Sequence, residues 1–138
     1  MPTPGLLDVR LGQAIDAGDL AVLTDLIAAG VDVNGVRGEL SALMSAVELG
    51  NLTFAETLID AGADVNFVTE SGWTALHHAV DVECDGYAQR KISPEIAMIQ
   101  LLLQARADAG VRYRGSTPAD DAGQRGWAEG ERVLRAAE

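Results

Sequence analysis

Residues 26–34 read LIAAGVDVN, and the same pattern returns 32 positions later, where residues 58–66 read LIDAGADVN. A weaker copy, LLQARADAG, occupies residues 102–110. A second pattern recurs out of phase with the first, as SALMSAV, TALHHAV and TPADDAG at residues 41–47, 74–80 and 117–123. One unit is therefore about 33 residues long, and repetition at a fixed period of this size indicates a fold made of stacked units.

Each unit contains the signals of a short helix. Ser41, Thr74 and Thr117 suit an N-cap, where a side-chain oxygen accepts a hydrogen bond from an otherwise unpaired backbone N–H. Pro118 follows at the first helical position, where its missing N–H costs nothing. Apolar residues then recur with i, i+3, i+4 spacing, which gives the helix one apolar face. Because one helix pair cannot bury such a face alone, we expect consecutive pairs to stack.

A second helix in each unit is predicted to end at a glycine. Gly30 and Gly62 suit the left-handed position that follows many helices. Arg106 takes this position in the third unit. Since a side chain makes the left-handed conformation unfavourable by about 1 kcal/mol, either Arg106 is strained or this helix ends differently.

The period of 33 residues and the segment TALHHA closely resemble ankyrin repeats, whose signature is T-P-L-H-x-A. The resemblance implies an all-α fold, an ankyrin-repeat solenoid of helix-turn-helix pairs joined by short hairpins. It covers nearly the whole chain, as one domain over residues 1–138, with degenerate first and last units that act as caps. The expected units are residues 6–34, 35–66, 67–109 and 110–138.

The third unit contains an insertion of 11 residues, because its two patterns are spaced more widely than in the second unit. The extra residues fall within 81–93, DVECDGYAQRKIS. This segment is polar, and Ser93 and Pro94 suit the first positions of a new helix. We therefore expect a loop at 81–93 between the two helices of the unit. Such a loop is either a second binding surface or a tolerated insertion.

Residues 77–85, HHAVDVECD, gather both histidines, three acidic residues and the only cysteine of the chain. The resemblance implies that His77 hydrogen-bonds locally and braces neighbouring units. His78 is expected to pack partly buried. Adjacent helical residues point about 100° apart, so the two histidines are poorly placed to share a metal ion. Cys84 would need a base held beside it to act as a nucleophile. A metal-binding enzyme is thus the least favoured hypothesis.

No enzyme motif is present, since the chain lacks a P-loop, a G-x-G-x-x-G that follows a strand, H-E-x-x-H and G-x-S-x-G. We therefore expect a protein without catalytic activity, cofactor or metal. No window approaches 18 apolar residues, and a lone cysteine forms no intrachain disulfide. These features favour a cytoplasmic protein, with no membrane partner.

The net charge of −11 is uneven. Residues 1–60 contain nine acidic residues against Arg10 and Arg37, whereas residues 101–138 contain six of each sign. Such a field repels nucleic acids and attracts a basic protein. The acidic residues could instead serve only to keep a repeat surface soluble.

The function implied by the resemblance is protein binding through the hairpin tips and the exposed ends of the first helices, which line a concave groove. Trp73 is the leading candidate, as an anchor for a partner or as a packing residue on the neighbouring hairpin. The predicted partner-binding residues are Arg37, Leu40, Glu48, Glu70, Ser71, Trp73, Asp81, Tyr113, Arg114 and Arg125, with Tyr87 in the insertion. We expect an inhibitor or immunity-type protein, monomeric when free, that binds a basic protein. The alternative is a scaffold or adaptor that tethers a regulatory partner.

Overall fold

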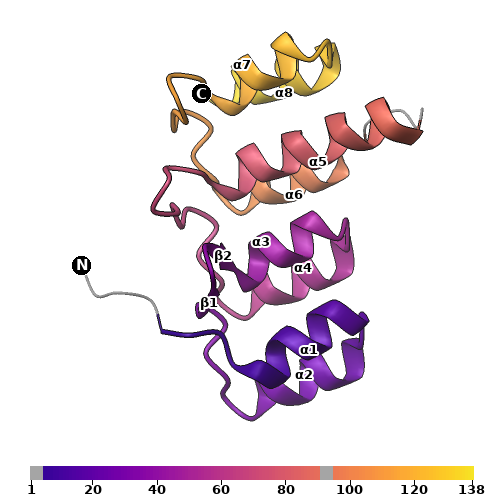
Figure 1. Ribbon diagram of the computed structural model, residues 1–138, viewed down its shortest axis with the longest axis vertical. Coiled ribbons are helices and arrows are strands. Elements are labelled where there is room, and N and C mark those ends of the chain that lie inside the picture. Colours follow the sequence, from indigo (N-terminus) through magenta and orange to yellow (C-terminus); the bar gives the residue numbers. More distant parts are fainter. Residues whose placement is uncertain (1–4, 91–94) are drawn as a thin grey trace. The chain divides into compact units, whose positions relative to one another are not determined.

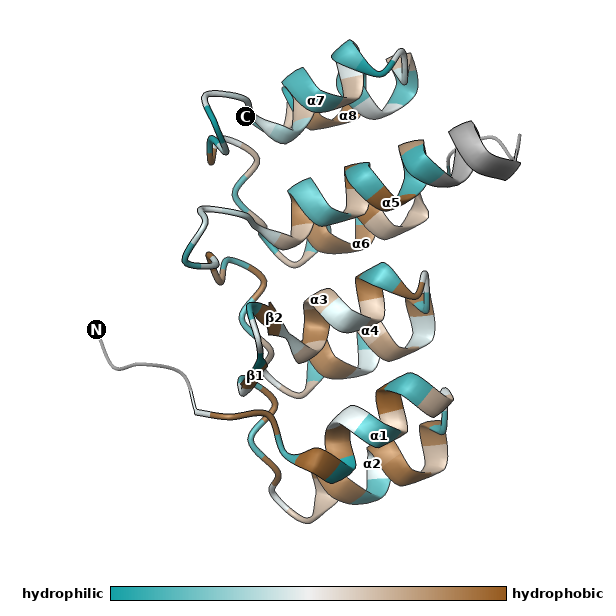
Figure 2. Ribbon diagram, in the orientation of Figure 1, coloured by the Kyte–Doolittle hydropathy of each residue, from teal (hydrophilic) through white to brown (hydrophobic). Residues whose placement is uncertain are grey.

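Pairs of short helices make up the chain (Figure 1). This computed structural model describes residues 5–90 and 95–138, with the side chains of 86–90 left aside. The chain divides into two larger units, a first unit at Met1–Asp64 and a second unit at Val65–Glu138. Each of these units contains two of the helix pairs that the sequence repeats form. Each helix carries hydrophobic and hydrophilic residues side by side (Figure 2), as expected for helices that bury one face. The prediction of a mostly helical repeat fold is confirmed.

The first unit holds two helix pairs and a small hairpin. Its elements are α1 (Val9–Ala17), α2 (Leu20–Ala28), β1 (Val36–Arg37), β2 (Leu40–Ser41), α3 (Ala42–Glu48) and α4 (Leu52–Asp60). The predicted N-cap at Ser41 is confirmed, because its hydroxyl accepts a hydrogen bond from the Met44 N–H at 3.2 Å. The core is fully buried and consists of Leu11, Ile15, Leu23, Leu43, Met44, Phe54 and Leu58.

The segment that precedes α1 pairs with the β1–β2 hairpin. Leu6 forms a parallel bridge with Val36, and the Leu7 N–H donates to the Val36 carbonyl at 2.8 Å. The backbones approach so closely that a Cβ on Gly35 would lie 2.8 Å from the Leu6 oxygen. Glycine at this position therefore allows the segment that precedes α1 to pair with the hairpin.

An asparagine in each unit links one repeat to the next. The Asn34 side chain donates to the Gly62 carbonyl at 3.2 Å and accepts from the Asp64 N–H at 2.8 Å. Asn66 makes the equivalent pair of bonds in the second unit, to Arg106 and Asp108. The asparagine that ends LIAAGVDVN and LIDAGADVN therefore binds the backbone at the equivalent turn of the next repeat.

The second unit contains α5 (Ala75–Arg90), α6 (Ala97–Gln104), α7 (Pro118–Gln124) and α8 (Ala128–Ala136). The expected loop at 81–93 is wrong, because α5 continues through Arg90. Val80 and Cys84 lie one helical turn apart and are both buried, so the inserted residues extend the packed face of the helix. The 16 residues of α5 span about 24 Å, more than twice the length of the 7-residue α7.

The helix after the insertion also begins differently from the prediction. Ser93 and Pro94 lie outside the described residues, and α6 starts at Ala97 without a side-chain cap. The Glu83 carboxylate of α5 accepts a hydrogen bond from the Glu95 N–H at 2.9 Å. The additional helical turns of α5 thus hold the segment that leads into α6.

The C-terminal repeat follows the sequence signals closely. Thr117 and Asp120 form a reciprocal capping box, and Pro118 stands at the start of α7. Trp127 is buried in the core of the last repeat. Its ring packs against Gly130, where a Cβ would lie 2.5 Å from the ring carbons. Arg106 has a φ of 70°, so the strained alternative holds at this position.

Candidate protein-binding site

A tight turn at residues 113–116 positions the main aromatic contact of the second unit. The Tyr113 N–H donates to the Ser116 carbonyl at 2.8 Å, and the Ser116 N–H donates back at 3.0 Å. Between them Arg114 and Gly115 both have positive φ, 52° and 84°, as in the two-residue turns that suit hairpins. The turn directs the Tyr113 ring onto Trp73, with centroids 5.1 Å apart and planes at 27°.

Trp73 is half-buried and packs against this neighbouring hairpin. The Trp73 N–H donates to the Thr69 hydroxyl at 3.0 Å, which fixes the preceding turn. The His78 ring lies 5.6 Å from the Trp73 ring, so His78 is the partly buried packing residue that the sequence predicts. The indole Nε1 of Trp73 is buried without a hydrogen-bond partner among the described residues. An unpaired buried N–H is unfavourable, so a hydrogen-bond acceptor beside the indole Nε1 would be stabilising.

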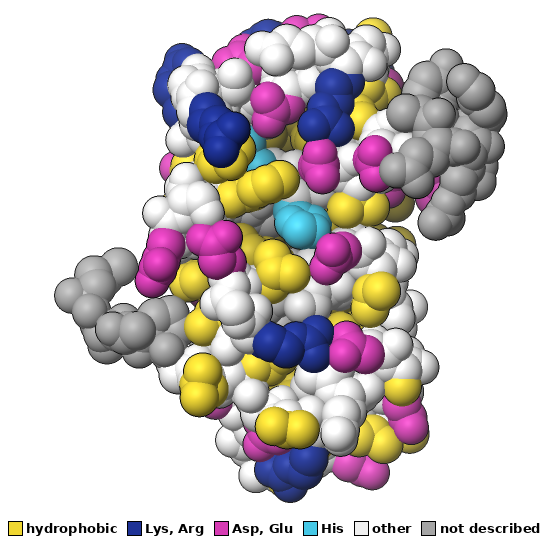
Figure 3. All heavy atoms as spheres, in the orientation of Figure 1, with side chains coloured by type: hydrophobic (Ala, Val, Ile, Leu, Met, Phe, Trp, Pro, Cys, Tyr) yellow, Lys and Arg dark blue, Asp and Glu magenta, His cyan; other side chains and the backbone are white. Residues whose placement is uncertain are grey.

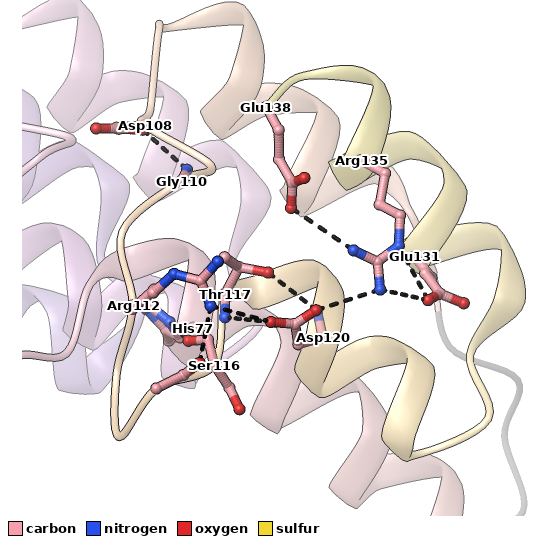
Figure 4. Close-up of polar contacts among 11 residues, drawn as sticks. His77, Asp108, Gly110, Arg112, Ser116, Thr117, Asp120, Glu131, Arg135 and Glu138 are labelled. Atoms are coloured by element: carbon pink, nitrogen blue, oxygen red, sulfur yellow. Dashed lines mark hydrogen bonds and ion pairs between the residues drawn. The ribbon is translucent and has the colours of Figure 1, made fainter.

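His77 joins α5 to the 113–116 turn, and its ring lies edge-on to the Tyr113 ring with centroids 6.0 Å apart. Its Nε2 donates to the Ser116 carbonyl at 3.1 Å, since a carbonyl can only accept (Figure 4). Its Nδ1 therefore accepts from the Thr74 hydroxyl at 2.8 Å. Burial lowers the pKa of His77, although the Ser116 carbonyl and Asp121 act in the opposite direction. His77 is thus a neutral structural link between two repeats, as the resemblance implies.

Charged side chains surround the aromatic pair. Arg125 donates to the Asp81 carboxylate at 2.7 Å, an ion pair that ties the end of α7 to α5. The Arg114 guanidinium lies 5.2 Å from the centre of the Tyr113 ring. Asp121 of α7 is half-buried, and burial raises the pKa of its carboxyl group. Figure 3 displays hydrophobic, histidine, acidic and basic side chains exposed together on one face of the molecule.

These groups enclose a pocket of about 170 Å³ in the second unit. The pocket combines aromatic rings with two aspartates and two arginines. Its lining residues are Trp73, His77, Val80, Asp81, Tyr113, Arg114, Ser116, Asp121 and Arg125. A concave site with apolar walls and a few polar groups is the usual form of a recognition pocket.

The structure brings together five of the predicted partner-binding residues. They line the pocket and are Trp73, Asp81, Tyr113, Arg114 and Arg125. The other predicted partner-binding residues that the structure describes lie outside the pocket. Glu70 and Ser71 are exposed in the preceding turn, and Arg37, Leu40 and Glu48 belong to the β1–β2 hairpin and α3 of the first unit. Arg37 binds both carboxylate oxygens of Asp16 at 3.0 Å. Tyr87 lies within α5, and its side chain falls outside the described residues.

Sequence reasoning did not select Asp121 as a pocket residue. When Thr117 is aligned with Thr74, Asp121 takes the position of His78, which already faces Trp73. Counting positions within the repeat could therefore have identified it. His77 also lines the pocket, although the sequence points only to its structural role.

The chemistry of residues 77–85 is that of a packed helix. Cys84 is buried, and burial raises the pKa of its thiol, which disfavours the reactive thiolate. Within residues 5–85 and 95–138, no three His, Cys, Asp or Glu side chains are grouped so as to hold a metal ion. In the same part of the chain, no helix combines the length and apolar character needed to cross a membrane.

The family of the chain follows from its similarity to known proteins. Residues 11–113 match the family model described as ankyrin repeats in three copies, and the chain belongs to this family. Ankyrin repeats mediate protein–protein interaction and are generally non-catalytic scaffolds. No curated protein matches the chain.

Two solved structures are similar to the chain over 94% of its length. One is an ankyrin repeat domain from Acinetobacter baumannii, with 32% identity and a TM-score of 0.81. The other is the ankyrin repeat domain of human ASB11, with 34% identity and a TM-score of 0.71. The chain spans 64% and 54% of those two structures, less than two thirds of either.

Proposed function

We propose that this chain is a non-catalytic binding protein for one basic protein, and that it acts as an inhibitor or immunity-type protein. The observation that carries this proposal is the charge of the first unit. Residues 1–64 contain ten acidic residues and only two arginines. Both arginines are already paired, Arg10 with Asp8 and Arg37 with Asp16. The excess negative charge thus remains available to attract a basic partner and to speed its association.

The proposed contact surface of the second unit consists of the pocket residues together with Glu70 and Ser71. Trp73 and Tyr113 supply the aromatic area that commonly anchors protein interfaces. Arg114 is exposed at the tip of its turn, and Asp81 and Arg125 lie on the pocket's rim, each about 40% exposed. Glu70 and Ser71 would add polar contacts at the edge, where they contribute more to specificity than to affinity. In the first unit, Arg37, Leu40 and Glu48 stay proposed contacts in their own right.

Affinity capture from the native cell extract tests this proposal. Wild-type protein is compared with Trp73→Ala at low and high salt, with Glu129→Ala on α8 as an exposed control. We expect one basic protein that is lost with Trp73→Ala, retained by the control and weakened by salt, because screening acts on exposed charges. Circular dichroism of each variant checks that the helices are retained.

The activity of the captured protein separates the inhibitor from the scaffold hypothesis. An inhibitor reduces the purified partner's own activity at a one-to-one ratio, and Trp73→Ala restores it. A scaffold leaves that activity unchanged while still binding. Capture of no basic protein, or capture that ignores both salt and Trp73, would contradict the proposed function.

A further inference from the structure

We propose that the pocket of the second unit holds one arginine side chain of the protein partner, with its guanidinium group against Asp121 and the Trp73 and Tyr113 rings. This inference rests on the proposed function and specifies the chemistry of its contact. Some of the groups that line the pocket already have hydrogen-bond, ion-pair or ring partners within the fold, whereas others do not.

The two arginines at the pocket already have partners. Arg125 donates to Asp81 at 2.7 Å, and the Arg114 guanidinium lies against the Tyr113 ring. Ser116 uses its carbonyl to accept from His77 and its N–H to bond Tyr113. These groups therefore offer little to an incoming acidic side chain, which would also face both aspartates.

Asp121 is the charged side chain of the pocket that makes no hydrogen bond, ion pair or ring contact with another described residue, whereas the Trp73 indole N–H lacks an acceptor. Its carboxylate is half-buried, and no hydrogen bond or ion pair joins it to another described residue. The groups that act electrostatically on it are Asp81 and the His77 ring of α5, Asp120 of α7, and Arg125, which follows α7. His77 is neutral, and Arg125 is already bound to Asp81, so the carboxylate remains poorly compensated. A hydrogen-bond donor with a positive charge would relieve this.

The aromatic and acidic walls of the pocket favour a guanidinium over an ammonium group. The guanidinium is planar, stacks on aromatic faces and donates two parallel hydrogen bonds to a carboxylate. The contact of Arg114 with Tyr113 shows that the Tyr113 ring accepts such a group in this structure. A basic segment attracted by the acidic first unit would supply the arginine.

Nuclear magnetic resonance provides a direct test on the whole chain. The chain contains two tryptophans, so a ¹⁵N-labelled sample has two indole N–H signals, and Trp73→Phe identifies that of Trp73. The probes are N-acetyl-arginine methylamide and its citrulline and glutamate counterparts. Citrulline has nearly the same shape as arginine but carries no charge.

We expect the arginine compound to shift the Trp73 signal saturably and to leave that of Trp127 in place. The citrulline and glutamate compounds should leave both signals unchanged. Asp121→Asn should weaken arginine binding by about tenfold, because a charge-assisted pair becomes a neutral one. Asp60→Asn, which removes one exposed charge from α4, is the matched control and should bind as wild type does.

An equal response to citrulline or glutamate, no saturable shift of the Trp73 signal, or undiminished binding to Asp121→Asn overturns the inference. These titrations need no partner protein. If they fail while a basic protein is still captured through Trp73, the proposed function stands and only the arginine pocket falls.

Discussion

Replacing His77 with alanine should destabilise the second unit strongly. The imidazole is 1% exposed and makes two hydrogen bonds, to the Thr74 hydroxyl and the Ser116 carbonyl. Each bond contributes about 1 kcal/mol, and the cavity and the stranded Ser116 carbonyl add a similar amount. We expect the free energy of unfolding to fall by about 3 kcal/mol, which lowers the Tm by more than about 10 °C in a unit of this size.

Tryptophan fluorescence isolates the effect, because both tryptophans, Trp73 and Trp127, belong to the second unit. Thermal unfolding followed by fluorescence should therefore shift more than unfolding followed by circular dichroism, which reports both units. His78→Ala is the control, since His78 is only half-buried. Its cost should be about 1 kcal/mol or less.

The stability should also depend on pH through His77. Burial lowers the pKa of His77 in the folded state, so the unfolded chain takes up a proton first as the pH falls below about 6.5. The stability from this group is therefore complete above that pH, and it decreases as the pH falls toward the folded-state pKa. His77→Ala should lose this part of the pH dependence. Equal effects of the two histidine variants, or an unchanged pH dependence, would refute the reasoning.

Two further predictions concern the backbone of the second unit. Arg106→Gly should raise the stability by about 1 kcal/mol in urea unfolding, because Arg106 has a φ of 70° that glycine adopts without strain. The same change at Arg132, inside α8, should lower it by about 1 kcal/mol, and a loss at both positions would contradict this account. Gly130→Ala should lower the Tm and destabilise by about 2 kcal/mol, because its Cβ would clash with the buried Trp127 ring. Its exposed neighbour Glu129→Ala should be neutral, and a neutral Gly130→Ala would argue against this packing.

Much of the fold could be predicted from the sequence because its signals are local. A hydroxyl at Ser41 or Thr117 needs only the next turn of the chain to cap a helix, and both caps are present. The repeat period is likewise visible without any contact between distant residues. Arg106 illustrates the limit of local reasoning, since the sequence left two alternatives and the φ of 70° in the structure decides between them.

The inserted segment was predicted wrongly for a physical reason. Its polar residues and Gly86 are typical of a loop, and glycine lowers helix propensity by about 1 kcal/mol. The burial of Val80 and Cys84 outweighs this preference, and α5 continues to Arg90. Helix propensity depends on the few residues around a position. The burial of these two side chains depends instead on other elements of the fold, which cannot be seen in the segment's own sequence.

By itself, the sequence determined the repeat unit, the helix caps at Ser41 and Thr117 and the acidic character of the first unit, and it selected Trp73 as a candidate contact. Only the tertiary structure decided that Trp73 stacks on Tyr113, that Arg125 pairs with Asp81, and that Asp121 faces the pocket without a partner. These residues lie about 40 positions apart in the chain. Caps and periodicity arise from bonds within one turn, but a pocket exists only once separate repeats have packed together.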